Sequence, residues 1–265
     1  MPFRTIKYTI APPLTQASVL AGMKEVLSQL GYTTPVDTYN AAGIEYVVYQ
    51  VVVNGSTKGT VYLRFQVGAA SSGGALGLLE MADGWNAGTH ASTGSTATIS
   101  ALTTYGSTTQ SSLVLYGFSS DNNEGNFFIP VLESTTGVPS GWMRPANKAA
   151  WYDENTYRFI FCPTNTGWST SWTTAAGITT AQLQARVTSS TTRANNLQFQ
   201  KRPIYVGPRR LVITSIGEIG YFSGDFAEVA PSGLPFGAPV VDPDTGQTYV
   251  LVTTSSTFVG LKVVT

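Results

Sequence analysis

The sequence predicts an α+β fold that is dominated by β-structure. Three observations lead to this prediction: one strongly periodic helical segment near the N-terminus, an alternating β-hairpin directly after it, and many short strand-like segments divided by Gly and Pro turns in the rest of the chain. We therefore expect an N-terminal layer of strand, helix and hairpin, followed by a β-rich region and a small C-terminal β portion.

The N-terminal layer begins with a short strand. Residues 3–10 alternate between apolar and polar side chains, and Pro12-Pro13 closes the segment. Apolar residues then recur at helical spacing on a single stripe, which predicts a helix that begins near Thr15 and ends at Gly31. The residues of this stripe are Val19, Leu20, Met23, Val26, Leu27 and Leu30.

The predicted hairpin joins residues 44–53 to residues 60–67 through a turn at Asn54–Gly59. In its second strand, Val61, Leu63, Phe65 and Val67 share one face, whereas Tyr62, Arg64 and Gln66 share the other. We expect the apolar face to pack against the helix as part of a core.

The rest of the chain carries shorter strand-like segments. No Asp, Glu, Lys or Arg occurs between Gly84 and Ser120, and we expect part of this region to form short strands or to lie against a partner. A short helix is expected around residues 180–186. The chain is divided into an α+β domain at residues 1–200 and a C-terminal β portion at 201–265. Further strands are expected at 113–118, 126–133, 157–162, 204–216, 248–253 and 258–264.

Charge and polarity narrow the classes of function. Fifteen basic residues balance fifteen acidic ones, so the chain has no net attraction for nucleic acid. Charged residues make up 11% of the chain, against about 25% in typical soluble domains. The polar surface therefore consists mostly of hydroxyl and amide groups, which are less costly to bury than ions. This composition favours a subunit packed in an assembly, although an extracellular β-protein would share it.

The chain offers few groups for a cofactor or a covalent link. A single cysteine, Cys162, cannot form an intramolecular disulfide, and with His90 as the single histidine no zinc ligand set can be assembled. We predict no cofactor. The apolar runs fall short of the roughly 20 residues that span a bilayer, and no secretion signal is apparent, so we expect a protein made in the cytoplasm without membrane insertion.

Candidate catalytic and metal sites are weak. Catalysis by His90 would need a nucleophile and a carboxylate, and Ser92 and Asp83 are the nearest in sequence, but no nucleophile elbow surrounds any serine. We expect His90 to be a surface or interface residue and Cys162 a small buried one. The acidic segments 121–124 and 242–244 lack the spacing of a calcium loop and are interpreted as turns.

Aromatic residues concentrate in the middle of the chain and are the candidate contact residues. They could anchor a protein interface, in which Trp and Tyr are enriched, or stack against a glycan. A sugar site would also be expected to have carboxylates beside the rings, and residues 163–200 contain none. Interface anchoring is therefore favoured for Trp142, Trp151, Tyr152, Trp168 and Trp172.

The order of these segments resembles that of virion proteins of tailed phages. The resemblance includes the helix and its exit at 26–33, the strand 61–67, and the segments 84–89, 127–132, 157–161, 220–224, 234–237 and 249–252. It covers most of the chain without a specific motif and carries no catalytic or ligand residues.

This resemblance implies a late structural protein of the phage virion, in the tail or baseplate, that binds other virion subunits and copies of itself and is not an enzyme. Two alternatives stay open. One is a receptor-binding module for host surface glycan, and the other is a neck or capsid decoration protein.

Overall fold

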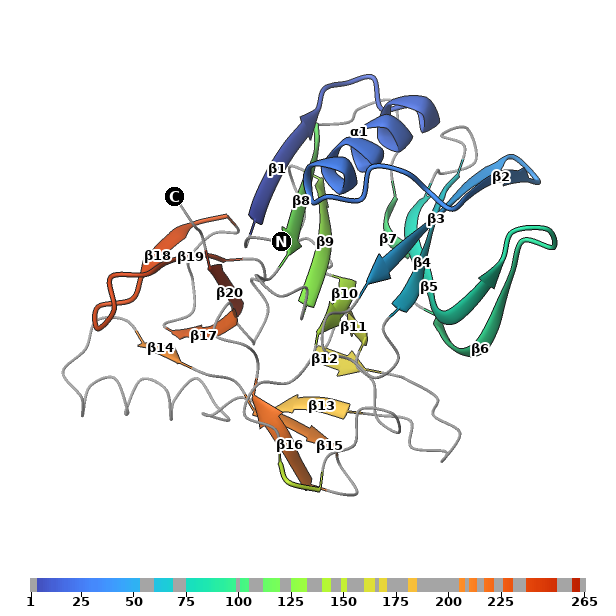
Figure 1. The fold of residues 1–265 in the computed structure, drawn as a ribbon. Helices are drawn as coiled ribbons and strands as arrows, with labels where there is room; N and C mark the ends of the chain where they lie inside the picture. Colours follow the sequence, from blue (N-terminus) through green and yellow to red (C-terminus); the bar gives the residue numbers. More distant parts are fainter. Residues whose placement is uncertain are drawn as a thin grey trace.

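The computed structural model shows an α+β protein that is mostly β, as the sequence predicts (Figure 1). One helix and three sheets make up the described part of the chain. The described residues are 4–52, 60–68, 75–98, 101–104, 112–119, 125–132, 140–143, 149–151, 160–164, 167–170, 181–184, 205–207, 210–213, 217–221, 226–230, 237–251 and 259–262.

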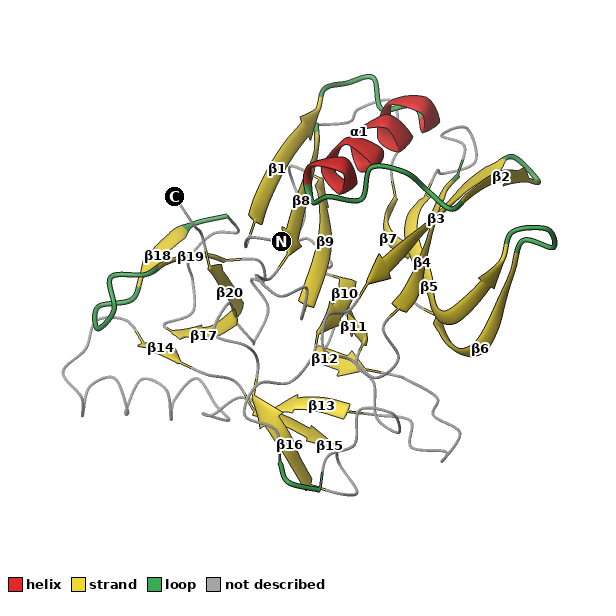
Figure 2. Cartoon of the chain, in the orientation of Figure 1, coloured by secondary structure: helices red, strands yellow, loops and turns green. Residues whose placement is uncertain are grey.

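Helix α1 spans Gln16–Gln29 and begins where the sequence predicts (Figure 2). Thr15 caps its N-terminus: the Thr15 hydroxyl accepts a hydrogen bond from the Ser18 N–H at 3.1 Å, and the Ser18 hydroxyl accepts one from the Thr15 N–H at 3.0 Å. The chain leaves the helix at Gly31, whose φ of 100° suits glycine. Of the predicted stripe, Val19, Met23, Val26, Leu27 and Leu30 are buried, and Leu20 is partly buried against the same core.

A six-stranded antiparallel sheet has the order β2-β3-β4-β5-β6, with β7 also paired to β5. The predicted hairpin is confirmed as β3 and β4, which pair from Glu45↔Val67 to Val52↔Thr60. The turn predicted at 54–59 lies outside the described residues. The strands are β2 (Asp37–Ala41), β3 (Ile44–Val52), β4 (Thr60–Val67), β5 (Ala75–Asn86), β6 (Ala91–Thr98) and β7 (Ala101–Thr104).

A nine-stranded path begins with β1, which pairs with β8 over its whole length. The expected short strands in the uncharged region are present as β6, β7 and β8. The path runs in the order β1 (Arg4–Ile10), β8 (Leu113–Ser119), β9 (Gly125–Leu132), β10 (Ser140–Met143), β11 (Ile160–Thr164), β12 (Gly167–Thr170), β13 (Ala181–Gln184), β15 (Arg210–Ile213) and β16 (Gly217–Tyr221).

The helix expected around residues 180–186 is wrong, because residues 181–184 form strand β13. This strand pairs with β12 on one side and β15 on the other. Pairing on both sides outweighs the weak helical preference of so short a segment.

A five-stranded sheet closes the chain and contains the predicted strands near 248–253 and 258–264. Its order is β14 (Tyr205–Gly207), β17 (Phe226–Ala230), β20 (Val259–Lys262), β19 (Thr248–Leu251) and β18 (Pro239–Val241). The division of the chain near residue 200 stays a prediction.

The main core lies where α1 meets strands of two sheets. The helix contacts β1 and β8 of the nine-stranded path and β4 of the six-stranded sheet, as Figure 1 shows. The Phe65 ring on β4 packs edge-on against the Phe128 ring on β9, with centroids 5.6 Å apart, and so connects the two sheets. The apolar face of β4 is buried here, as the alternation predicts.

Close packing of α1 depends on two glycines. A Cβ atom on Gly117 of β8 would lie 2.5 Å from Val26 Cγ1, and one on Gly22 of α1 would lie 2.5 Å from Ile10 Cδ1. Both distances are too short for a real contact, so the absence of a side chain sets how closely the helix approaches these strands.

Among the residues that the structure describes, no helix is long and apolar enough to cross a bilayer.

Candidate functional site

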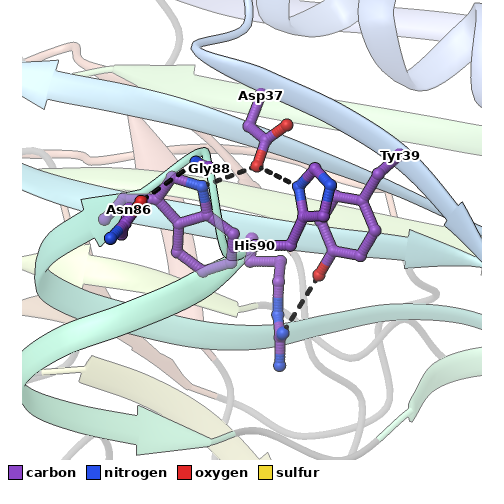
Figure 3. A network of polar contacts seen from close by, with 7 residues as sticks. Asp37, Tyr39, Asn86, Gly88 and His90 are labelled. Carbon is purple, nitrogen blue, oxygen red and sulfur yellow. Dashed lines mark hydrogen bonds and ion pairs between the residues drawn. The ribbon is translucent and has the colours of Figure 1, made fainter.

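His90 lies at the tip of the hairpin formed by β5 and β6 (Figure 3). The tip is shaped by Asn86, whose side-chain oxygen accepts a hydrogen bond from the Gly88 N–H at 2.9 Å. His90 then adopts a φ of 51°, a conformation that costs energy for a residue other than glycine. Contacts of the imidazole with β2 offset this cost.

The partner of His90 is Asp37 on β2. Asp37 Oδ2 lies 2.9 Å from His90 Nδ1 and accepts a hydrogen bond from Trp85 Nε1 at 2.8 Å. The Asp37 side chain is 7% exposed, whereas that of His90 is 46% exposed. One carboxylate oxygen therefore connects the hairpin tip and the end of β5 to β2.

These contacts set the ionisation of Asp37. Burial raises its pKa, but the hydrogen bonds from His90 and Trp85, the charge of His90 and the Thr38 N–H together hold the pKa below its ordinary value. Asp37 is therefore present as a carboxylate at neutral pH, the form that accepts both side-chain hydrogen bonds.

A stack of aromatic rings surrounds this pair. The Tyr39 ring lies between the rings of His90 and Tyr46, with centroid distances of 4.2 Å and 4.7 Å. The Arg64 guanidinium lies over the rings of Tyr46 and Trp85, 5.5 Å and 5.7 Å from their centroids, and donates a hydrogen bond to the Tyr39 hydroxyl at 3.2 Å. We call these six residues the Asp37 clasp: Asp37, Tyr39, Tyr46, Arg64, Trp85 and His90.

The clasp joins strands that are not neighbours in the sheet. Trp85 on β5 reaches Asp37 on β2 although β3 and β4 lie between them in strand order. Because one side chain cannot cross a flat sheet of that width, the sheet must curl towards this face. Val48 and Ala82 lie on the face opposite the main core by their register and are nevertheless buried. The clasp side of the sheet thus also buries apolar side chains.

The geometry corrects the sequence-based choice of residues around His90. The carboxylate that bonds His90 is Asp37, not Asp83, which lies beside Gly94 on the neighbouring strand. Ser92 is paired with Trp85 in the β5–β6 ladder. Within the described ranges, no side chain is hydrogen-bonded to Nε2 of His90. In the part of the chain that the structure describes, the imidazole therefore has an orienting carboxylate but no serine or cysteine bonded to it as a nucleophile.

The other candidate chemical groups are Asp242, Cys162 and the acidic segment at 121–124. Both carboxylate oxygens of Asp242 are used inside its own turn, by the Asp244 N–H at 3.0 Å and the Thr245 hydroxyl at 2.7 Å. Cys162 lies on β11 opposite Ser169. Residues 121–124 lie outside the described ranges, and within those ranges no three His, Cys, Asp or Glu side chains gather as a metal site.

The predicted aromatic contact residues are only partly placed. Trp151 is 45% exposed. Trp142 lies on β10 and Trp168 on β12, with β11 between these strands. Tyr152 and Trp172 lie outside the described residues. Their assignment to an interface stays a prediction.

Sequence reasoning missed most of the clasp. The alternation of its strand places Arg64 on the polar face, but Asp-Thr-Tyr-Asn-Ala has no apolar alternation and so does not predict β2. Without that strand no pattern connected Asp37 to His90, 53 positions away.

No family model matches the chain, and a search of curated proteins gives no significant match.

Proposed function

We propose that this chain is a non-enzymatic structural subunit of a tailed-phage virion, placed in the tail or baseplate and acting by subunit assembly. It would be made in the host cytoplasm and incorporated into the particle with copies of itself and other subunits. The order of segments that resembles tailed-phage virion proteins supports the particle assignment. The low charge and the 27 glycines of a hydroxyl-rich chain fit a surface that is buried against neighbours.

The contacts that His90 makes are the observation that supports a non-enzymatic role for this chain. His90 is the single histidine of the chain. One of its ring nitrogens is bonded to Asp37, and its ring is stacked on that of Tyr39. These contacts fasten the β5–β6 hairpin to β2, which is a structural task. Within the described residues, no serine or cysteine is bonded to the imidazole as a nucleophile.

Particle composition tests this proposal. Particles of a phage that encodes the chain would be purified by density gradient, and the chain would be quantified by mass spectrometry against a known capsid protein. We expect a fixed copy number per particle that persists through a high-salt wash. Loss of the chain from washed particles would contradict a structural role.

A host-glycan receptor is the second candidate, and the exposed indole of Trp151 is the observation that favours it. A glycan array with the isolated chain separates the two functions. Binding that is lost in Trp151→Ala but kept in Val52→Ala, a change at another exposed apolar residue, would support the receptor function. No binding would leave the structural proposal as the better account.

A further inference from the structure

Strand β6 has a free edge in the described sheet. It is the last strand in the order β2-β3-β4-β5-β6 and pairs with β5 through residues Asn86↔Ala91 to Glu80↔Thr98. The other side of β5 is occupied by β4. A terminal strand has a row of backbone N–H and C=O groups that another extended chain can bond.

Among the described strands that end a sheet order, β6 is the one without a protective feature; β7, which also pairs with β5, has only four residues. Natural proteins guard sheet edges with charges, with proline or by keeping the strand short. Strand β1 carries Arg4 and Lys7, β2 carries Asp37, and β16 carries Glu218. Strands β14 and β18 have three residues each, and β18 contains Pro239. Strand β6 has eight residues, ASTGSTAT, with neither charge nor proline.

The clasp holds this edge in place. His90, which directly precedes β6, is bonded to Asp37, and Trp85, at the paired end of β5, is bonded to the same oxygen. Ala91, Thr93 and Gly94 are exposed. An edge that is already ordered loses little conformational entropy when a second strand binds.

We propose that β6 is the surface through which two copies of this chain pair, strand against strand and antiparallel about a two-fold axis. The pairing would deepen the proposed function by naming a subunit contact, and only its role in a particle rests on that function. A second copy fits because β6 meets its own sequence without charge repulsion, and Thr and Ser pairs across antiparallel strands are favourable.

The shape of strand β6 also determines how strongly two copies are expected to associate. Between Ala82↔Thr96 and Gly84↔Thr93 strand β6 has one residue more than β5, which is a bulge near Gly94. A bulge divides the edge into two short stretches, so the new ladder would be small. We therefore expect weak association that depends on concentration in solution and is strengthened by the many contacts of an assembly.

Sedimentation velocity of the full chain over a range of concentrations tests the proposal. A low ionic strength of about 0.01 M lets charges act over roughly 30 Å. The chain has no net formal charge, so one added charge acts locally rather than through overall repulsion. The variants are Thr93→Lys, Thr93→Glu and their equal mixture. The control is Thr34→Lys, an exposed threonine in the loop between α1 and β2, outside both the clasp and β6.

We expect the wild type and Thr34→Lys to associate with rising concentration, and each Thr93 variant alone to need a several-fold higher concentration. The mixture of the Lys and Glu variants should associate again, because opposite charges then meet across the axis. Circular dichroism checks that each variant folds, and Ala91→Lys with Ala91→Glu replaces any pair that does not.

Three results would overturn the pairing: a wild type that stays monomeric throughout, Thr93 variants that associate like the wild type, or a mixture that does not recover. None of these bears on whether the chain occurs in particles, which is measured separately. A chain absent from particles that still pairs through β6 would refute the proposed function and leave the pairing intact.

Discussion

The Asp37 carboxylate and the His90 imidazole meet at 2.9 Å although 53 positions separate them in sequence. Asp37 lies on β2, and His90 lies at the tip of the β5–β6 hairpin, so the contact joins the first strand of the sheet to the last hairpin. Trp85 donates to the same carboxylate oxygen. These two contacts bring strands together that are not neighbours in the sheet, so the sheet curls towards this face.

A double-mutant cycle measures the strength of the Asp37–His90 contact. We expect Asp37→Asn and His90→Asn each to lower the free energy of unfolding by about 1–2 kcal/mol, with a coupling energy of about 0.5–3 kcal/mol between them. Asparagine at position 90 tolerates a positive φ, so backbone strain does not confuse the comparison. Urea unfolding gives the four values. Glu25→Gln, on the exposed side of α1, is the control and should change stability little. Strictly additive single effects would contradict a direct contact.

Acid should weaken the clasp in a defined range of pH. Because the pKa of Asp37 is lowered in the folded protein, its charged form contributes stability that is complete above the ordinary value of 3.8 and is lost as pH falls through the lowered value. The difference in unfolding free energy between wild type and Asp37→Asn should therefore shrink from pH 5 to pH 2. A difference that stays constant over this range would show that the charge of Asp37 plays no part.

High pH should destabilise the protein through ionisation of Tyr49 in the main core. Burial raises the pKa of Tyr49 to about 12, from an ordinary value of 10.0. The neutral phenol is favoured in the folded state, so its contribution to stability is complete below pH 10 and is lost between about pH 10 and 12. Tyr49→Phe removes this ionisation and should lose less stability than the wild type between about pH 10 and 12. If urea unfolding shows that both proteins lose the same stability over this range, the raised pKa of Tyr49 is contradicted.

The approach of α1 to β8 should depend on Gly117. In Gly117→Ala the new Cβ would lie 2.5 Å from Val26 Cγ1 and 2.8 Å from Leu30 Cδ1. We expect a loss of about 1–3 kcal/mol from this overpacking. The matched control is Gly88→Ala, where the added Cβ would approach only Asn86 Oδ1, at 3.3 Å. Thermal unfolding compares the two, and equal melting temperatures would show that the helix can move away at little cost.

The sequence predicts those parts of the fold whose signals are local. The stripe from Val19 to Leu30 and the alternation from Val61 to Val67 both describe one buried face, and both elements are confirmed. Strand β2 and strand β13 lack such a pattern and exist because neighbouring strands pair with them. The clasp could not be predicted for the same reason, since its central carboxylate lies on β2.

Direct localisation of the chain on intact particles is the measurement that tests the central claim most directly. Cryo-electron microscopy of phage particles carrying a labelled copy should place the label at symmetry-related positions in the tail or baseplate, in a fixed number of copies. Label at the neck or on the capsid would show that the subunit occupies that position in the particle instead. Particles without label, assembled normally from a strain that expresses the chain, would contradict the account of a virion subunit.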